Sequence, residues 1–222
     1  MHSINNKNNI PNVTNIINKK IYDNIISEHK LKSSNIKKRL IEFSKNRLLN
    51  PEEKFVELCF CICTPQSQAK KVAEVINNKN ISLLIKASQK KLENNLRGKT
   101  RFHKNKTKYI LHARKHLHNI KNLPVNTTKA REWLVKNIKG LGYKEASHFL
   151  RNIGYRNICI IDRHVIKIMH EVGVFENNTP PKNTKEYLLM EQKVKDFAKQ
   201  LKIDVDELDL LMWSMRTGFI FK

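Results

Sequence analysis

The sequence is poor in acidic residues. Asp and Glu number 20 against 43 Lys and Arg, which leaves a formal net charge of +23 over 222 residues. A background composition rich in Lys, Asn and Ile would raise lysine everywhere. So large an excess also favours a polyanionic partner, because Lys and Arg contacts to phosphate release counterions. Nucleic acid is the first such partner to consider, and a ribosomal role or binding to an acidic surface are the alternatives.

Long apolar runs are missing as well. No stretch of about 18 apolar residues is present, so we expect no membrane-spanning helix. The opening "MHSINNKNNIPNV" lacks the apolar core of a signal peptide, and we therefore expect a cytoplasmic protein. Because the first dozen residues are polar and rich in Asn and Lys, we expect residues 1–30 to form an N-terminal extension and first helix that is only partly ordered. A single domain would follow at residues 31–222.

Cysteine is scarce, with four residues in the chain. Cys59, Cys61 and Cys63 lie together in "FVELCFCICT" and do not resemble a disulfide framework. A C-x-C-x-C spacing could hold a metal ion. The flanking run is apolar throughout, however, so we expect buried thiols that behave as small apolar side chains and no metal site.

Helical periodicity dominates the rest of the chain. Apolar residues recur at spacings of three and four, for example in "SQAKKVAEVINN", "TTKAREWLVKNI" and "TKEYLLMEQKVKDFAKQL". Start signals agree: Ser34 as an N-cap, Pro51 in a first turn, and N-x-x-E and D-x-x-E boxes at Asn183 and Asp204. The single β-like run is the short "NICIID", residues 157–162. The sequence therefore predicts an all-α protein of many short helices.

Glycine is rare too, yet two of the 6 glycines stand one residue apart in "KGLGYKEAS". The local order is a helix, a tight turn and a second helix, over about residues 130–154. The turn residues Lys139, Gly140, Leu141 and Gly142 could direct backbone N–H groups outward beside the free N–H groups of the second helix. Such a turn would bind a DNA phosphate, although an ordinary helix–helix turn without a ligand fits the residues equally well.

The hairpin "IKGLGYKEASHFLRNIG" followed by "ICIIDRH" is similar to the helix-hairpin-helix motif and downstream aspartate of the DNA glycosylase superfamily named after it. More narrowly, the chain resembles the type 2 8-oxoguanine DNA glycosylase/lyases. Four blocks in the same order carry this resemblance: "CTPQSQA" (Cys63–Ala69), "RFHKNKTKYI" (Arg101–Ile110), the hairpin, and "LDLLMWSMRTGFIFK" (Leu208–Lys222). The resemblance implies a two-subdomain helical fold with its active site in the cleft between the subdomains.

Two residues around the hairpin are candidates for catalysis. An amine can attack the anomeric carbon of a nucleotide, displace the base and leave a Schiff base. Lys144 lies in the first turn of the second helix, where the positive end of the helix dipole disfavours an added proton. Contact with phosphate is its alternative role, and the resemblance implies the nucleophile. Asp162 is an expected N-cap; the resemblance makes it the catalytic aspartate, whose carboxylate can stabilise positive charge on the sugar and help deprotonate Lys144.

A glycosylase must also hold a base that has been rotated out of the duplex. We expect Trp133 to be a core residue. Phe102 and Trp213 would by default be core residues as well, but the resemblance implies that they sandwich the extruded guanine. It also implies that the terminal Lys222 reaches the damaged base, unless the chain simply happens to end there. Gln66 matches a glutamine that related enzymes insert into the vacated gap, with turn or cap chemistry as the alternative.

Relatives such as endonuclease III bind an iron–sulfur cluster through four spaced cysteines. Here the only cysteine after Cys63 is Cys159, so we expect neither that cluster nor any other cofactor. We predict a monomeric, nucleoid-associated enzyme that removes 8-oxoguanine from duplex DNA and cleaves the abasic site by β-elimination through a lysine Schiff base. The alternatives are a glycosylase for another oxidised base and a non-catalytic helix-hairpin-helix DNA-binding module.

Overall fold

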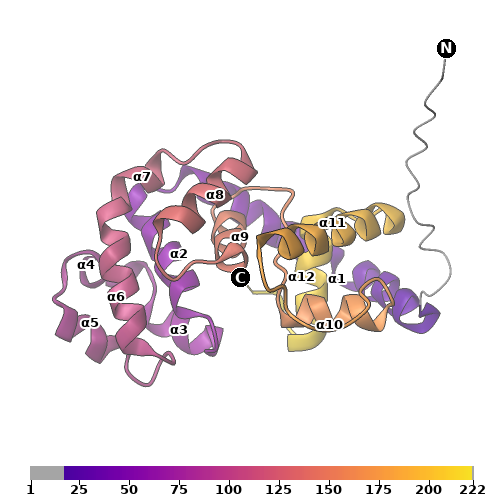
Figure 1. Ribbon diagram of the computed structural model, residues 1–222, viewed down its shortest axis with the longest axis horizontal. Coiled ribbons are helices and arrows are strands. Elements are labelled where there is room, and N and C mark those ends of the chain that lie inside the picture. Colours follow the sequence, from indigo (N-terminus) through magenta and orange to yellow (C-terminus); the bar gives the residue numbers. More distant parts are fainter. Residues whose placement is uncertain (1–17, 222) are drawn as a thin grey trace, which may run out of the picture.

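The computed structural model describes residues 18–221, and within that range every regular element is a helix (Figure 1). The predicted all-α fold class is confirmed. In chain order the elements are α1 (Lys19–Lys45), η2 (Asn46–Leu48), α2 (Pro51–Cys63), α3 (Ala69–Val75), η3 (Asn78–Asn80), α4 (Ile81–Lys86), α5 (Gln89–Leu96), α6 (His103–Ala113), η4 (Arg114–His116), α7 (Leu117–Lys121), α8 (Thr127–Asn137), α9 (Tyr143–Asn152), α10 (Arg163–Glu171), α11 (Thr184–Leu201) and α12 (Val205–Thr217). None of these helices is long and apolar enough to cross a bilayer.

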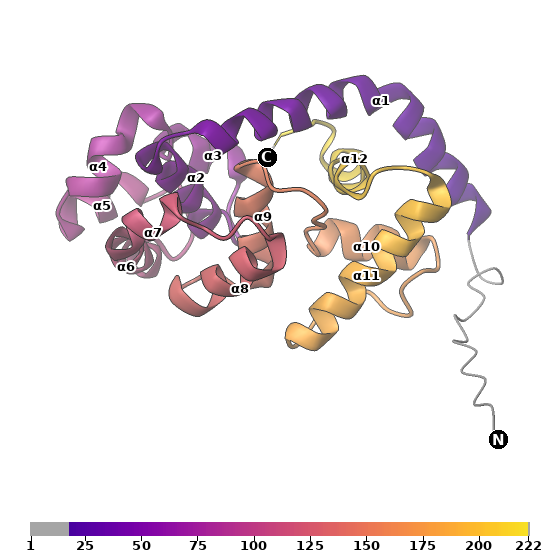
Figure 2. The same cartoon turned by 90° about the horizontal axis from the view of Figure 1, so that it is seen from above.

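The helices pack around two separate hydrophobic cores. The first core is built from α2 to α9, with Phe55, Phe60 and Phe149 fully buried in it. The second is built from α1, α10, α11 and α12. Figure 2 shows the two groups side by side, with α1 running along one edge from the second group to the first. The protein thus has two helical subdomains, and α9 leads the chain from the first into the second.

Helix α1 differs from the expected layout. It begins at the N-cap Asn18, whose side chain accepts a hydrogen bond from the backbone N–H of Ile21, and continues without interruption to Lys45. Ser34 lies inside this helix, so the prediction that it caps a helix start was wrong. The buried Ile25 and Ile36 show the reason, because both belong to one apolar face that extends past Ser34. The boundary that we drew between residues 30 and 31 falls within the same helix.

The other predicted helix starts are confirmed. Pro51 is the first residue of α2, and Asn50 and Glu53 form a reciprocal capping box around it. Asn183 caps α11 by accepting from Glu186 N–H at 2.9 Å, and Asp204 caps α12. These signals were readable because each uses partners within three residues of the cap.

The four cysteines are buried, which was predicted for Cys59, Cys61 and Cys63. Cys59, Cys61 and Cys63 lie on α2 in the first core, and Cys159 lies in the second. Burial raises the pKa of the Cys63 thiol to about 12 and that of Cys59 well above its usual range. A thiol that stays protonated packs as a small apolar group and is a poor metal ligand.

Candidate active site

The predicted hairpin is present as α8, a turn at residues 138–142, and α9. Gly140 has φ +87°, a backbone conformation that side chains disfavour. A Cβ at this position would also lie 2.4 Å from the ring of Tyr109 on α6. Glycine is therefore required here for two reasons, and the close approach brings the tip of the hairpin against α6.

Two amides of the hairpin turn already have partners within the protein. The N–H of Leu141 donates to the carbonyl of Ile138 at 3.3 Å, and the N–H of Gly142 donates to Oε2 of Glu145 at 3.2 Å. A phosphate at Gly142 would therefore compete with a carboxylate of the same helix. Phosphate binding by this turn stays a prediction.

Lys144 is the second residue of α9, at the helix end that carries the positive dipole. Its side chain is 40 % exposed, and its Nζ lies 3.0 Å from Oε1 of Glu145. The Glu145 carboxylate thus bonds to both Gly142 and Lys144, and it fixes the lysine against the start of the helix. The ammonium is accessible, and a proton acceptor is in contact with it.

Asp162 is the N-cap of α10, as predicted. Its Oδ1 accepts hydrogen bonds from the backbone N–H groups of His164 at 2.8 Å and Val165 at 2.9 Å. The side chain is half-buried. Two N–H donors on a single oxygen hold the carboxylate in one orientation.

The segment that leads to Asp162 is neither a helix nor a strand, despite its β-like sequence. The backbone N–H groups of residues 157–161 are satisfied by side chains of α11 and α12, in the second subdomain. The bonds run from Asn157 and Ile158 to Asp206 (2.9 and 3.2 Å), from Cys159 to Glu191 (3.2 Å), from Ile160 to Asp209 (3.0 Å), and from Ile161 to the Tyr187 hydroxyl (3.2 Å). Because buried amides without partners are costly, these side chains fix the path of the chain into Asp162.

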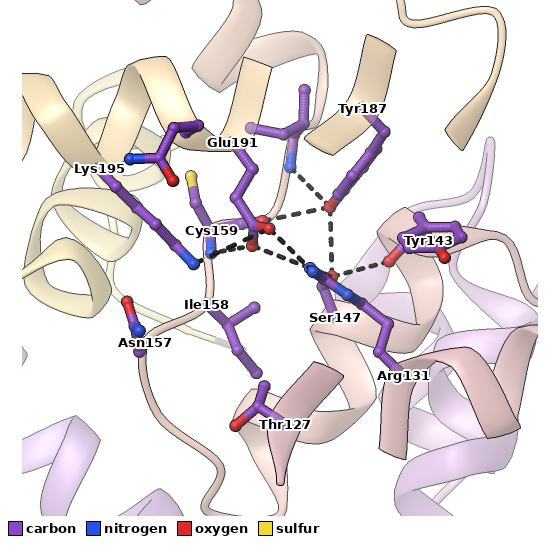
Figure 3. Close-up of polar contacts among 12 residues, drawn as sticks. Thr127, Arg131, Tyr143, Ser147, Asn157, Ile158, Cys159, Tyr187, Glu191 and Lys195 are labelled. Carbon is purple, nitrogen blue, oxygen red and sulfur yellow. Dashed lines mark hydrogen bonds and ion pairs between the residues drawn. The ribbon is translucent and has the colours of Figure 1, made fainter. Parts of the chain in front are cut away.

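Two of these carboxylates also bind the hairpin. Arg131 of α8 forms a bidentate pair with Glu191 of α11 at 2.8 and 2.9 Å, and Arg151 of α9 pairs with Asp209 of α12. Figure 3 shows Glu191 between the Arg131 guanidinium and the backbone of Cys159. The two hairpin helices α8 and α9 are therefore joined to the segment that ends at Asp162 through shared, buried carboxylates.

Sequence reasoning did not single out these ion pairs. A usable signal was present on α11, where Glu191 falls four residues after the buried Tyr187 and three before the buried Val194. A charged residue on the apolar face of a helix indicates a buried partner. The pattern does not say which arginine that partner is.

The two predicted base-stacking aromatics lie in different environments. Phe102 is 54 % exposed, so its default interpretation as a core residue is wrong. It has φ +56° at the N-cap of α6, with the Arg101 guanidinium 5.2 Å from its ring centroid. Trp213, on α12, is partly buried and packs edge-on against Phe219 with ring centroids 5.1 Å apart. Trp133 packs against the first core, as predicted.

The other two predicted substrate-binding residues are Gln66 and Lys222. Gln66 is exposed in the turn between α2 and α3, with φ +55°. Lys222 lies outside the described residues, which reach its neighbour Phe221. The carbonyl of Phe221 accepts from Arg39 Nε at 2.9 Å, and its ring packs edge-on against Phe60 of the first core.

Comparison with known proteins bears on this arrangement. Residues 36–203 match the model of a helix-hairpin-helix family described as 8-oxoguanine DNA glycosylase. The chain belongs to the 8-oxoguanine DNA glycosylase family. Among its relatives, the 8-oxoguanine DNA glycosylase/AP lyase of Fusobacterium nucleatum is 40% identical over 214 residues, 90% of this chain and 97% of the relative. The enzyme of the same name from Methanocaldococcus jannaschii is 38% identical over 202 residues, 86% of this chain and 96% of that one.

Solved structures of the family agree. The crystal structure of the Methanocaldococcus jannaschii 8-oxoguanine DNA glycosylase matches with a TM-score of 0.83 at 34% identity, over 92% of this chain and 97% of that chain. The Thermotoga maritima 8-oxoguanine DNA glycosylase gives a TM-score of 0.85 at 27% identity, over 92% and 99%. A further Methanocaldococcus jannaschii structure, in complex with a 15mer DNA containing 8-oxoguanine, gives 0.81 at 35% identity, over 89% and 99%. The family recognised from the motifs is confirmed.

Proposed function

We propose that this protein removes 8-oxoguanine from duplex DNA and then cleaves the strand at the abasic site. The observation that carries the proposal is the hairpin itself: an accessible lysine at the start of α9, joined through buried ion pairs to the segment ending at Asp162, in a chain of this family. Relatives that align over nearly their whole length are named glycosylase/AP lyases, and one solved neighbour holds DNA containing 8-oxoguanine.

Lys144 is the proposed nucleophile. Its neutral amine attacks C1′ of the extruded nucleotide, the C1′–N bond to the base breaks, and the base leaves with a proton. The sugar ring then opens to an imine, loses a proton from C2′, and expels the 3′ phosphate. Asp162 stabilises the positive charge that develops on the sugar and helps deprotonate Lys144.

The turn from Lys139 to Gly142 is the proposed binding site for a DNA phosphate. Backbone contacts of this kind fix where the DNA lies without reading its sequence. The formal charge of +23 supports the same partner, because a basic protein gains affinity for DNA by releasing counterions. For phosphate to reach the Gly142 amide, the Glu145 carboxylate must turn away, which would also loosen its contact with Lys144.

The base is proposed to be read by residues from both subdomains. Phe102 is an exposed aromatic beside α6, and Trp213 presents a partly buried ring on α12. We assign them to the two faces of the extruded guanine, Lys222 to its polar edge, and Gln66 to the gap left in the duplex. These residues would determine which damaged base is recognised, while Lys144 and Asp162 would carry out the reaction in a cleft between the subdomains. We further propose that the enzyme acts as a cytoplasmic monomer on chromosomal DNA, without a cofactor.

Borohydride trapping tests the proposal directly. Incubation with a duplex containing 8-oxoguanine and borohydride should yield a covalent protein–DNA adduct, because reduction of the imine makes it permanent. Lys144→Gln should give none, while Lys139→Gln, four residues before the first residue of α9, should bind the duplex more weakly but still form the adduct. A wild-type protein that binds the duplex but is never trapped would refute the lyase mechanism and favour a non-catalytic hairpin module.

A further inference from the structure

Two turns present residues proposed to contact the DNA, Gln66 in the vacated gap and Phe102 on the extruded base, and both are strained. Gln66 and Phe102 have left-handed backbone at φ 55° and 56°, although neither is glycine. Such conformations persist only where the surrounding structure enforces them, and they occur preferentially at functional sites. The turns touch each other: Ser67 Oγ lies 2.8 Å from Thr100 Oγ1 and accepts from the backbone N–H of Arg101 at 3.0 Å.

Lys106 lies between the two turns. It belongs to α6 but is only 5 % exposed, in contrast to most lysines of the chain. Its Nζ lies 2.7 Å from the carbonyl oxygens of Cys63 and Pro65, 2.7 Å from Thr100 Oγ1, and 3.1 Å from Ser67 Oγ. Two of these acceptors immediately flank Gln66 in the sequence, and a third lies two residues before Phe102. The backbone N–H of Lys106 also donates to the carbonyl of Phe102 at 3.0 Å.

The charge on Lys106 is maintained at a cost. Burial lowers the pKa of Lys106 to about 8, and the positive charges of Arg101 and Lys144 act in the same direction. Cys63 and Glu145 act in the opposite direction on this pKa. An apolar side chain would avoid the desolvation of the ammonium, but it would leave the carbonyls of Cys63 and Pro65 with only the hydroxyls of Thr100 and Ser67 as donors, at 2.6 and 3.3 Å. A buried lysine is explained if the turns must be held together.

We propose that Lys106 is a positioning residue that joins the turn of Gln66 to the turn of Phe102 into one rigid unit, so that Gln66 enters the vacated gap while Phe102 holds the extruded base. This inference rests on the proposed function, because it uses the roles assigned there to Gln66 and Phe102. It assigns Lys106 to base extrusion and base holding. Cleavage of a preformed abasic site needs no base to be extruded, and is expected to depend on Lys106 much less.

The test compares Lys106→Met with Lys108→Met. Both variants remove one positive charge from α6, but Lys108 is exposed, so the pair separates positioning from loss of charge near DNA. Single-turnover rates would be measured on an 8-oxoguanine duplex and on a duplex with a preformed abasic site. We expect Lys106→Met to slow 8-oxoguanine excision by about tenfold or more relative to Lys108→Met, with abasic cleavage changed by no more than about twofold. Equal losses on both substrates, or none on either, would overturn the proposal.

Energetic coupling between Lys106 and Gln66 distinguishes a positioning role of Lys106 from a purely structural one. Gln66→Ala should slow excision strongly in the wild-type background and only weakly in the Lys106→Met background, because the turn is already released there. Additive effects would overturn the inference. If Lys106→Met does not fold, Thr100→Val replaces it: the variant removes the hydroxyl that connects the turns and should lower excision selectively. Unchanged excision by Thr100→Val would then count against the proposal.

The controls separate this inference from the proposed function. Trapping of wild-type protein on 8-oxoguanine DNA is measured first. If no adduct forms, the proposed function fails and Lys106 loses its assigned role with it. If the adduct forms and Lys106→Met behaves like Lys108→Met, the function stands and only the positioning role of Lys106 is refuted.

Discussion

Replacement of Glu191 by Gln tests whether the buried ion pairs hold the two subdomains together. The side chains of Arg131 and Glu191 are each 4 % exposed, and they share two hydrogen bonds of 2.8 and 2.9 Å. Glutamine keeps the volume and an acceptor for the backbone N–H of Cys159, but it leaves the Arg131 charge buried without a counterion. Loss of one partner of such a pair costs about 3–5 kcal/mol. In a chain of this size that lowers the melting temperature by roughly 6–20 °C.

The assay is urea unfolding followed by circular dichroism, with Lys195→Met as the control. Lys195 lies 3.9 Å from Glu191 and is more exposed, so its loss should change the free energy of unfolding by less than about 1 kcal/mol. The paired variant Arg131→Met with Glu191→Leu should recover part of the loss, because no charge is then left uncompensated. A Glu191→Gln variant as stable as wild type would refute the claim that this ion pair holds the two subdomains together.

Three further predictions concern the hairpin, the N-cap of α10 and the pH dependence of stability. Gly140→Ala should lower the melting temperature and the affinity for undamaged duplex more than Gly98→Ala, because both have positive φ but only Gly140 would clash with a ring; equal effects would contradict the close packing. Asp162→Asn should keep the melting temperature, since Asn also caps helices, yet slow excision in single-turnover assays; unchanged excision would exclude catalysis by the carboxylate. Burial lowers the pKa of Lys106 to about 8. Between pH 8 and the ordinary pKa of lysine, the unfolded chain therefore holds a proton on Lys106 that the folded chain has lost, and the free energy of unfolding should rise with pH. Lys106→Met should flatten that rise.

Local features of the fold could be predicted from the sequence. The starts of α2, α11 and α12 follow from Pro51, Asn183 and Asp204, because a cap and its partners lie within one turn of each other. Asp162 was found as a cap for the same reason. Ser34 was wrongly predicted to be an N-cap because the residue type alone does not distinguish a serine inside a helix from one at a helix start. Only the continuity of the apolar face from Ile25 to Ile36 decides between them.

The long-range ion pairs and hydrogen bonds of the candidate site could not be predicted in this way. Arg131 and Glu191 are 60 residues apart, and their pairing depends on how the two subdomains pack. Lys106 is one of several lysines in "RFHKNKTKYI", and the sequence does not mark it as the buried one, because two of its acceptors, the carbonyls of Pro65 and Cys63, lie 41 and 43 residues earlier. Periodicity assigns a residue to a face of its helix. It does not identify what a charged side chain on that face contacts.

The central claim is that Lys144 is the nucleophile and not a phosphate contact. The most direct test measures Lys144→Gln twice, for single-turnover release of 8-oxoguanine and for affinity to the same duplex. We predict that chemistry is lost by several orders of magnitude while the dissociation constant changes by less than about tenfold, because one phosphate contact contributes only part of the binding. A variant that loses affinity in parallel with activity, or that still forms the borohydride adduct, would contradict this account.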